Sequence, residues 1–257
     1  MDLKGKVALV TGGATGIGRA TVLALAKAGV AGVAINYRTA KKEVDQLAEE
    51  VRKHGVEALC LRADVKSERQ LLRMVQQVDD QFQRLDILVN NAGTTQWVPL
   101  NDLEALTDDV WDDILDVNLK GAFRCTRLAA PLLAKTGGMV INIASISGIL
   151  APATMSSLPY GTTKAALIYL TRALAVALAP KVRVNAVAPA FTDTRWMKEH
   201  YGKEYDQVVR HSAANIPLGR VATPEEVAQV ATFCALDAPA SMTGSIIDVN
   251  GASYLRS

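Results

Sequence analysis

The sequence has few cysteines, no long apolar run and no excess of charge of one sign, and each absence excludes a class of protein. Its three cysteines, Cys60, Cys125 and Cys234, are too far apart for a disulfide framework or a zinc site. No apolar run reaches the roughly 18 residues of a membrane helix, so we expect no membrane span. A formal net charge of +2 gives no reason to expect a nucleic acid partner or an anionic membrane surface.

The sequence also shows no clustered metal ligands, and we expect no secretory leader. The histidines, His54, His200 and His211, are widely separated, and we expect the aspartates of DDVWDD (108–113) to lie on an exposed helix face. The sequence therefore predicts no metal site. The first residues, MDLKGKVALVTGG, pass from lysines directly into a strand-like run without a signal-peptide core. We expect a cytoplasmic location.

The sequence does contain a regular alternation of apolar runs and helical segments. Buried parallel strands are continuous apolar runs, and such runs cover 6–12, 32–37, 57–64, 85–90, 138–145, 182–189 and 244–251. Helical spacing covers 18–29, 40–55, 67–82, 107–135, 164–179 and 223–236, with Ser67 and Thr223 as expected N-caps. This alternation predicts an α/β fold of the Rossmann type, a doubly wound seven-stranded parallel sheet with helices on both faces.

No linker or repeat interrupts the alternation, so we expect residues 1–257 to form a single domain. The segment 193–217 is the exception, because it is long, polar and contains aromatic residues where a strand–helix unit would be expected. We interpret it as an inserted helical lid or substrate loop.

A glycine-rich loop follows the first predicted strand. The stretch VTGGATGIGRA places Gly12, Gly16 and Gly18 in a G-x-x-x-G-x-G pattern just before a helix. Glycines allow a sharp turn and close approach to a pyrophosphate, whose charge then lies at the helix N-terminus. The alternative is a turn that only packs. Its place at the carboxyl end of the first strand favours nucleotide binding.

The residues that follow the second predicted strand bear on which dinucleotide binds. Sites for NAD usually place a carboxylate there to accept hydrogen bonds from the ribose, whereas this chain has Asn36, Tyr37 and Arg38, followed by Lys41 and Lys42. A guanidinium suits a 2′-phosphate, although a solvated basic helix start is the alternative interpretation. We expect NADP(H) in preference to NAD(H).

With these motifs, the chain resembles the classical short-chain dehydrogenase/reductase family over nearly its whole length. The motifs occur in the family's order: TGGATGIG at 11–18, ADV at 63–65, NNAG at 90–93, Asn118, Ser145, and the Y-x-x-x-K pair Tyr160 and Lys164. A Y-x-x-x-K pair alone is not specific, but the ordered set is. Within the family, the pattern is most similar to that of 3-oxoacyl-[acyl-carrier-protein] reductases, and alcohol and sugar dehydrogenases look similar.

The resemblance implies hydride transfer between a nicotinamide and a carbonyl or secondary alcohol. It assigns proton delivery to Tyr160, a hydrogen bond to the carbonyl oxygen to Ser145, water binding to Asn118 and ribose binding to Lys164. Positions 160 and 164 share a helix face, and we expect the Lys164 ammonium to lower the pKa of the Tyr160 phenol. The implied cofactor-binding residues are Gly12, Thr15, Gly16, Ile17, Gly18, Tyr37, Arg38, Asp64, Val65, Asn91, Ala92, Gly93, Tyr160, Lys164 and Thr192.

Three departures from the family pattern bear on these assignments. Pro189–Ala190 stands where the family usually has proline–glycine, and we expect a small backbone adjustment there. Thr15, not arginine, precedes Gly16, which leaves more of the NADP(H) preference to Arg38. Ser147 is an alternative to Ser145 as the hydrogen-bonding serine.

The substrate and the partners are less strongly specified. We expect Gln96, Trp97, Ser156 and Trp196 on the substrate wall, which makes the pocket moderately apolar. Lys198, Lys203 and Arg210 alternate with acidic residues, so they support an acidic acyl carrier protein only weakly, and a small free carbonyl is the alternative. The apolar helix at 164–179, together with the resemblance, predicts a homotetramer. The rival hypothesis, a non-catalytic NADP(H)-binding redox sensor, is disfavoured because Tyr160 and Lys164 are both present.

Overall fold

The computed structural model describes residues 3–150, 157–236 and 238–254, and its described strands form one seven-stranded sheet in the order β3-β2-β1-β4-β5-β6-β7. Each neighbouring pair of strands is parallel. The strands are β1 (Val7–Val10), β2 (Gly32–Tyr37), β3 (Glu57–Arg62), β4 (Ile87–Asn90), β5 (Met139–Ile143), β6 (Arg183–Pro189) and β7 (Ile246–Val249). Each lies within one of the predicted runs, so the doubly wound parallel sheet is confirmed.

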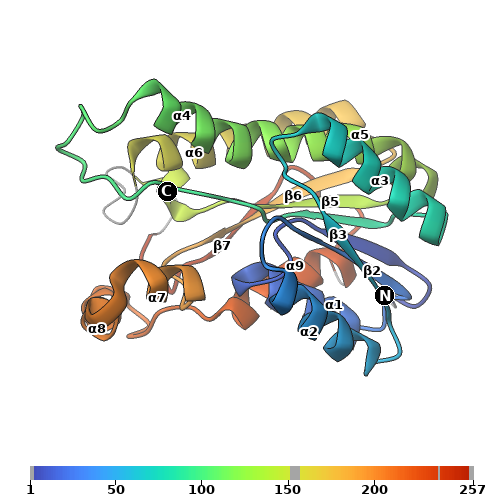
Figure 1. Ribbon diagram of the computed structural model, residues 1–257, viewed down its shortest axis with the longest axis horizontal. Helices are drawn as coiled ribbons and strands as arrows, with labels where there is room; N and C mark the ends of the chain where they lie inside the picture. The colour runs from blue at the N-terminus through green and yellow to red at the C-terminus, as the bar shows by residue number, and fades with distance from the viewer. Residues whose placement is uncertain (1–2, 151–156, 237, 255–257) are drawn as a thin grey trace.

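Helices cover both faces of the sheet (Figure 1). One face carries α1 (Gly16–Lys27), α2 (Lys41–Arg52) and α9 (Pro224–Leu236), and the other carries α3 (Glu68–Phe82), α4 (Asp108–Leu115), α5 (Ala122–Thr136) and α6 (Leu158–Leu178). Their apolar sides meet the strands in two large buried clusters, one on each face. In the described part of the chain, no helix combines the length and the apolarity that crossing a bilayer requires.

The expected caps fix two helix starts. The Ser67 hydroxyl accepts a hydrogen bond from the amide of Gln70 at 3.4 Å, where α3 begins. At α9, the Thr223 hydroxyl accepts from the Glu226 amide at 3.3 Å, and the Glu226 carboxylate accepts from the Thr223 amide at 2.9 Å. This reciprocal pair is a capping box, so both predicted N-caps are confirmed.

The helical region predicted at 107–135 is interrupted by a π-helical turn, η1 (Asp116–Gly121), which separates α4 from α5. A π turn inserts one extra residue into the helical path, and such turns are frequent at functional sites. Gly121, the last residue of this turn, packs closely against Val65 in the loop after β3. A Cβ atom at position 121 would lie 3.0 Å from Val65 Cγ2, so the close contact favours glycine. Asn118 lies inside this turn.

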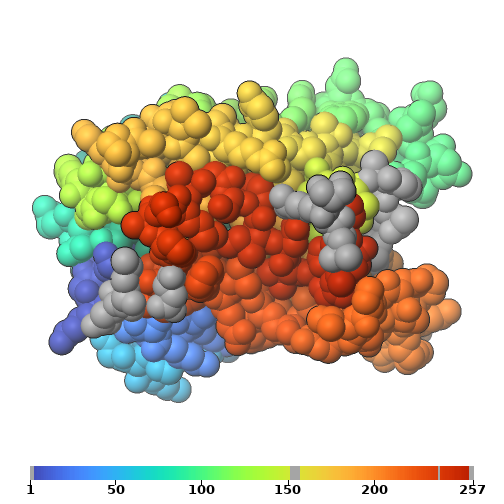
Figure 2. Space-filling model, turned by 180° about the vertical axis from the view of Figure 1, so that it is seen from behind, coloured from blue at the N-terminus to red at the C-terminus, as the bar shows by residue number. Residues whose placement is uncertain are grey.

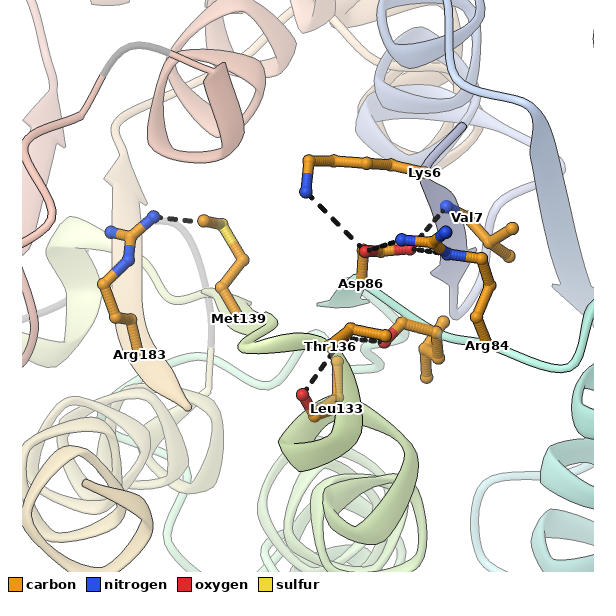
Figure 3. Close-up of polar contacts among 9 residues, drawn as sticks. Lys6, Val7, Arg84, Asp86, Leu133, Thr136, Met139 and Arg183 are labelled. Carbon is orange, nitrogen blue, oxygen red and sulfur yellow. Dashed lines mark hydrogen bonds and ion pairs between the residues drawn. The ribbon is translucent and has the colours of Figure 1, made fainter. Parts of the chain in front are cut away.

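A buried carboxylate anchors the amino-terminal end of β1 to β4 (Figure 3). Asp86 accepts a hydrogen bond from the Val7 amide at 2.9 Å, and Arg84 donates to it from Nε at 2.9 Å and from Nη2 at 2.8 Å. Lys6 Nζ lies 3.7 Å from the same carboxylate. This network therefore fixes the end of β1 opposite to the glycine-rich loop.

The segment predicted as a lid is helical. It contains α7 (Arg195–Tyr201), a short 3-10 turn η3 (Gly202–Glu204) and α8 (Tyr205–Ala214). The orange part of the surface in Figure 2, to which this segment belongs, forms a lobe at one end of the molecule. Tyr205 donates a hydrogen bond to Asp193 at 2.6 Å, which ties α8 to the start of the segment.

Candidate active site

A cavity of about 800 Å³ opens at the carboxyl ends of the strands, within the usual size range of small-molecule sites. Its walls come from the segments that follow β1 to β6, and from α6 and α7. The structure brings nearly all the predicted site residues to this cavity. The predicted residues that do not line it are Gly18, Asn118 and Gln96. Ser156, also expected on the substrate wall, lies outside the described residues.

The glycine-rich loop is shaped for close approach of a ligand. Gly12 has a φ of +59°, and a Cβ on Gly18 would lie 2.3 Å from the Gly12 carbonyl oxygen, so side chains are excluded at both positions. Thr15, the N-cap of α1, makes no capping hydrogen bond through its side chain, and the first turn of α1 contains no acidic residue. The N-terminus of α1 therefore suits an anionic group such as a pyrophosphate.

Two polar side chains, one from each segment, join this loop to the residues that follow β4. Asn91 Nδ2 donates hydrogen bonds to the carbonyl oxygens of Thr11 and Gly12, each at 3.0 Å. The Thr11 hydroxyl accepts from the amides of Asn91 at 3.0 Å and Ala92 at 3.1 Å. The NNAG motif thus supports the glycine loop, and its last three residues also line the cavity.

Asn36 is a positioning residue that the sequence reasoning missed. Its Oδ1 accepts a hydrogen bond from the Gly12 amide at 3.2 Å, and its Nδ2 donates to the carbonyl oxygens of Leu61 at 3.3 Å and Ala63 at 3.0 Å. The side chain is buried between β1, β2 and β3. The sequence could have identified this role, because Asn36 is an asparagine inside an otherwise apolar strand run and a buried amide needs hydrogen-bond partners.

The end of the cavity beside β2 holds charged side chains. Arg38 is exposed and lines the cavity together with Glu43. The Glu43 carboxylate accepts a hydrogen bond from Arg195 Nη1 at 2.6 Å, and this contact lowers the pKa of Glu43. The ion pair joins α2 to α7 and was not predicted.

Ser145 and Tyr160 meet at the other end of the cavity. The Ser145 hydroxyl accepts a hydrogen bond from the Ser147 amide at 3.1 Å, which fixes Ser145 as the cap of the 3-10 turn η2 (Ile146–Gly148). Burial raises the pKa of Tyr160 to about 12, and a hydrogen bond with Ser145 opposes part of that rise. Of the two candidate serines, Ser145 is the one that interacts with the phenol.

Lys164 lies one helical turn after Tyr160 in α6. Its Nζ donates a hydrogen bond to the Ile143 carbonyl oxygen at 2.7 Å and lies 5.5 Å from the centre of the Tyr160 ring. The residue is only 4% exposed, and burial lowers the pKa of its amine to about 8. The expectation that Lys164 lowers the pKa of Tyr160 is wrong, because removal of the phenol from water is the dominant effect and raises that pKa.

Asn118 lies behind this pair and does not line the cavity. Its Oδ1 accepts from the Thr94 amide at 2.8 Å, and its Nδ2 donates to the Thr94 carbonyl oxygen at 2.9 Å and to the Thr163 hydroxyl at 3.1 Å. The side chain therefore ties the loop after β4 and the helix α6 to the π turn, and both of its amide hydrogens are used.

The departure at Pro189–Ala190 leaves the backbone unstrained. Gln83 and Ala252 are the described non-glycine residues with a positive φ, so Ala190 adopts a conformation that alanine tolerates. The Ala190 amide donates to the Val249 carbonyl oxygen at 2.9 Å, and the Thr192 hydroxyl donates to the Ala190 carbonyl oxygen at 3.0 Å. Thr192 therefore reaches the cavity wall without a glycine at position 190.

The described residues contain no group of three or more histidine, cysteine, aspartate or glutamate side chains arranged to hold a metal ion. The polar groups that converge on the cavity are instead a phenol, a hydroxyl and an amine. They suit proton transfer and hydrogen bonding to an oxygen atom.

Comparison with known proteins gives matches along nearly the whole chain. A family model described as enoyl-(acyl carrier protein) reductase matches residues 12–252. A 3-oxoacyl-[acyl-carrier-protein] reductase of Staphylococcus aureus is 36% identical over 252 residues, which cover 97% of this chain and 98% of the relative. The enzyme of that name from Pseudomonas aeruginosa is 35% identical over 257 residues, covering 99% and 100%. The crystal structure of a short-chain type dehydrogenase/reductase from Mycobacterium marinum has a TM-score of 0.88 at 34% identity, covering 98% and 96%.

Proposed function

The chain belongs to the short-chain dehydrogenase/reductase family, whose members are oxidoreductases that act on CH–OH and carbonyl groups, and we propose that it reduces a carbonyl compound with NADPH. The observation that carries this proposal is the meeting of Ser145, Tyr160 and Lys164 in the cavity that also contains the glycine-rich loop. A nicotinamide cofactor supplies a hydride to the carbonyl carbon, and the protein must supply the proton and bind the oxygen.

The residues of the cavity fit such a cofactor. The glycine loop and the N-terminus of α1 would hold the pyrophosphate, because the loop excludes side chains and no carboxylate lies in the first turn. Arg38, exposed on the cavity wall, would bind a 2′-phosphate, which supports NADP(H) over NAD(H). Lys164 would donate to the nicotinamide ribose, and Thr192 would lie beside the nicotinamide.

Tyr160 would be the acid. At neutral pH the phenol, whose pKa burial raises to about 12, holds the proton that it would donate to a carbonyl oxygen during hydride transfer. Ser145 would donate a hydrogen bond to the same oxygen and stabilise its developing negative charge. A protonated phenol is the form that reduction of a carbonyl requires.

Lys164 would return the proton to Tyr160, since its amine has a pKa of about 8 and lies on the same helix face. Asn118 uses both side-chain hydrogens on Thr94 and Thr163, so a relay water at this residue would have to bind its main-chain carbonyl. We assign Asn118 as a positioning residue for the π turn and the loop after β4.

The relatives named as 3-oxoacyl-[acyl-carrier-protein] reductases make a 3-oxoacyl thioester one candidate substrate, with the 3-oxo oxygen placed at Tyr160. A free carbonyl compound is the other. The charge pairing on α7, described below, favours the free compound.

A homotetramer is part of the proposal. Helix α6 presents apolar side chains to solvent, with Tyr169 73% exposed and Val176 81% exposed. Figure 2 shows α6 in yellow along one edge of the molecule. Burial of such a stripe against a second copy would stabilise an oligomer, and sedimentation at micromolar concentration tests it. The cytoplasmic location stays a prediction from the sequence.

The proposed function is tested with Tyr160→Phe. Loss of the phenolic proton should reduce turnover of a carbonyl panel by about 10²–10⁴-fold while NADPH still binds, because general acid catalysis contributes about that much. Tyr169→Phe, on the exposed side of the same helix, is the matched control and should retain activity. Near-normal turnover in Tyr160→Phe would refute the assignment, and NADPH binding by a wild-type protein with no turnover of any carbonyl would favour the redox-sensor hypothesis.

A further inference from the structure

Aromatic rings extend from Tyr160 along one side of the cavity. The Trp196 ring lies 6.1 Å from the Tyr160 ring and 5.5 Å from the Trp97 ring, centre to centre. Trp97 in turn stacks on His200 at 3.8 Å and 10°, and Tyr201 lies 5.9 Å from Trp97. We call Trp97, Trp196, His200 and Tyr201 the aromatic wall. It joins the loop after β4 to α7 directly beside the proposed acid.

Within this wall, Trp196 is the ring that a ligand in the cavity can contact. His200 lies nearly parallel against Trp97 and covers one of its faces. Trp196 is tilted by 50° to Trp97 and by 54° to Tyr160, and it remains 39% exposed although it lines the cavity. A ligand that reaches Tyr160 therefore meets an indole surface next to the reacting oxygen.

The cations near the wall are already paired. Arg195 binds both Glu43 and Glu199, and Lys198 binds Asp193 at 2.8 Å. The other charged side chains among the described lining residues are Arg38, Asp64 and Lys164. Arg38 and Asp64 follow β2 and β3, and Lys164 donates a hydrogen bond to the Ile143 carbonyl oxygen, so every described lining cation at this end of the cavity already has a partner.

His200 adds no positive charge to the wall at neutral pH. Burial lowers the pKa of its imidazole from an ordinary value that already lies below 7. The wall is therefore neutral, apolar and built of flat rings. Such a surface favours a flat, uncharged group, because aromatic pairs gain from offset or tilted ring contacts beyond the area that they bury.

Resting on the proposed function, we propose that the substrate is a free, uncharged ketone or aldehyde with an aryl group next to its carbonyl, and that this group packs on Trp196 with Trp97 behind it. The carbonyl oxygen then faces Tyr160 and Ser145, and the aryl ring occupies the aromatic wall. Trp196 and Trp97 are specificity-determining residues, and a carrier-bound flexible acyl chain gains no ring contact from them.

The test compares acetophenone with cyclohexyl methyl ketone, which have the same number of carbon atoms but differ in ring character. With NADPH, kcat/KM is measured for both ketones in the wild type and in Trp196→Leu, Trp97→Leu and Trp111→Leu. Trp111 is the remaining one of the chain's three tryptophans. It lies in α4 and does not line the cavity, so it is the matched control. The two ketones differ in intrinsic reactivity, and the decisive quantity is the change in their ratio between variants.

Trp196→Leu should lower the aryl-to-cyclohexyl ratio of kcat/KM by roughly two- to tenfold, the range expected for one aromatic contact. Trp97→Leu should lower it in the same direction, and Trp111→Leu should leave it unchanged. An equal loss for both ketones in Trp196→Leu, or a 3-oxoacyl carrier thioester that outperforms acetophenone in wild-type protein, would overturn the aryl assignment while leaving the reductase function intact. If the wild-type protein reduces none of the carbonyl compounds, the proposed function is overturned, and this inference with it.

Discussion

Replacing Lys164 with methionine should remove the contribution of this lysine to the pH dependence of the free energy of unfolding between about pH 8 and pH 10. Burial lowers the pKa of the Lys164 amine from 10.5 to about 8. Between these values the unfolded chain holds a proton on Lys164 that the folded chain has released. Raising the pH therefore favours the folded wild type, at about 1.36 kcal/mol for each pH unit of the interval.

The magnitude follows from the width of the interval. From pH 8 to pH 10, the free energy of unfolding of the wild type should rise by about 2 kcal/mol relative to that of Lys164→Met, because Lys164 is half-titrated in the folded protein at pH 8 and partly titrated in the unfolded chain at pH 10. At pH 7 the lysine is protonated in both states and the burial cost is fully present. Methionine removes that cost but also removes the hydrogen bond to the Ile143 carbonyl oxygen, worth about 1.5–3 kcal/mol, so the two proteins should be similarly stable there.

Urea unfolding of both proteins at pH 7, 8, 9 and 10, at one fixed protein concentration, measures this difference. The pH range ends at 10 because of Tyr160. Its pKa in the folded protein, about 12, exceeds its ordinary value, so its contribution to the free energy of unfolding falls above pH 10 in both proteins. Lys181→Met, which removes an exposed lysine after α6, serves as the control and should track the wild type. A difference between wild type and Lys164→Met that stays flat from pH 7 to 10 would show that Lys164 is not held in a lowered-pKa state.

Three further substitutions test other parts of the structure. Arg38→Ser should raise the KM for NADPH by about tenfold or more, the loss expected for a charge-assisted hydrogen bond, while that for NADH stays similar; equal losses would contradict the 2′-phosphate assignment. Gly18→Ala should weaken NADPH binding at least about tenfold in a fluorescence titration, because the new Cβ would lie 2.3 Å from the Gly12 carbonyl oxygen, and unchanged affinity would argue against a rigid loop. Asp86→Ala removes the buried carboxylate of Figure 3 and should lower Tm by roughly 5–10 °C while activity at 25 °C persists, since the network lies at the opposite end of β1 from the glycine loop; an unchanged Tm would refute the anchoring role.

The sheet was predictable because its physics is local. A strand buried on both faces must be apolar along its whole length, and a parallel neighbour requires a helix between the two, so the apolar runs specified the number and direction of the strands. The glycine loop was predictable for a related reason, since a loop that approaches a ligand closely leaves no room for side chains. Each of these signals lies within a short stretch of sequence.

What the sequence did not predict depends on contacts between distant segments. The π turn shifts helical hydrogen bonding by one residue, and the apolar spacing of 107–135 is compatible with either form. The Glu43–Arg195 ion pair joins residues far apart in the chain, and the stacking of His200 on Trp97 joins α7 to the loop after β4. The direction of the Tyr160 pKa shift depends on the depth of the cavity, which the four-residue spacing to Lys164 does not determine.

The opposite shifts of Tyr160 and Lys164 argue for function independently of any resemblance. In the described part of the chain, Lys164 forms no ion pair with a carboxylate, and its recorded partner is a main-chain carbonyl oxygen. A buried amine of this kind is costly at neutral pH, and an apolar side chain of similar length would fill the same space without that cost. A fold selected for stability alone would not keep a lysine there. The same burial that makes Lys164 costly sets its amine, beside the proposed acid, near the pH at which protons are exchanged.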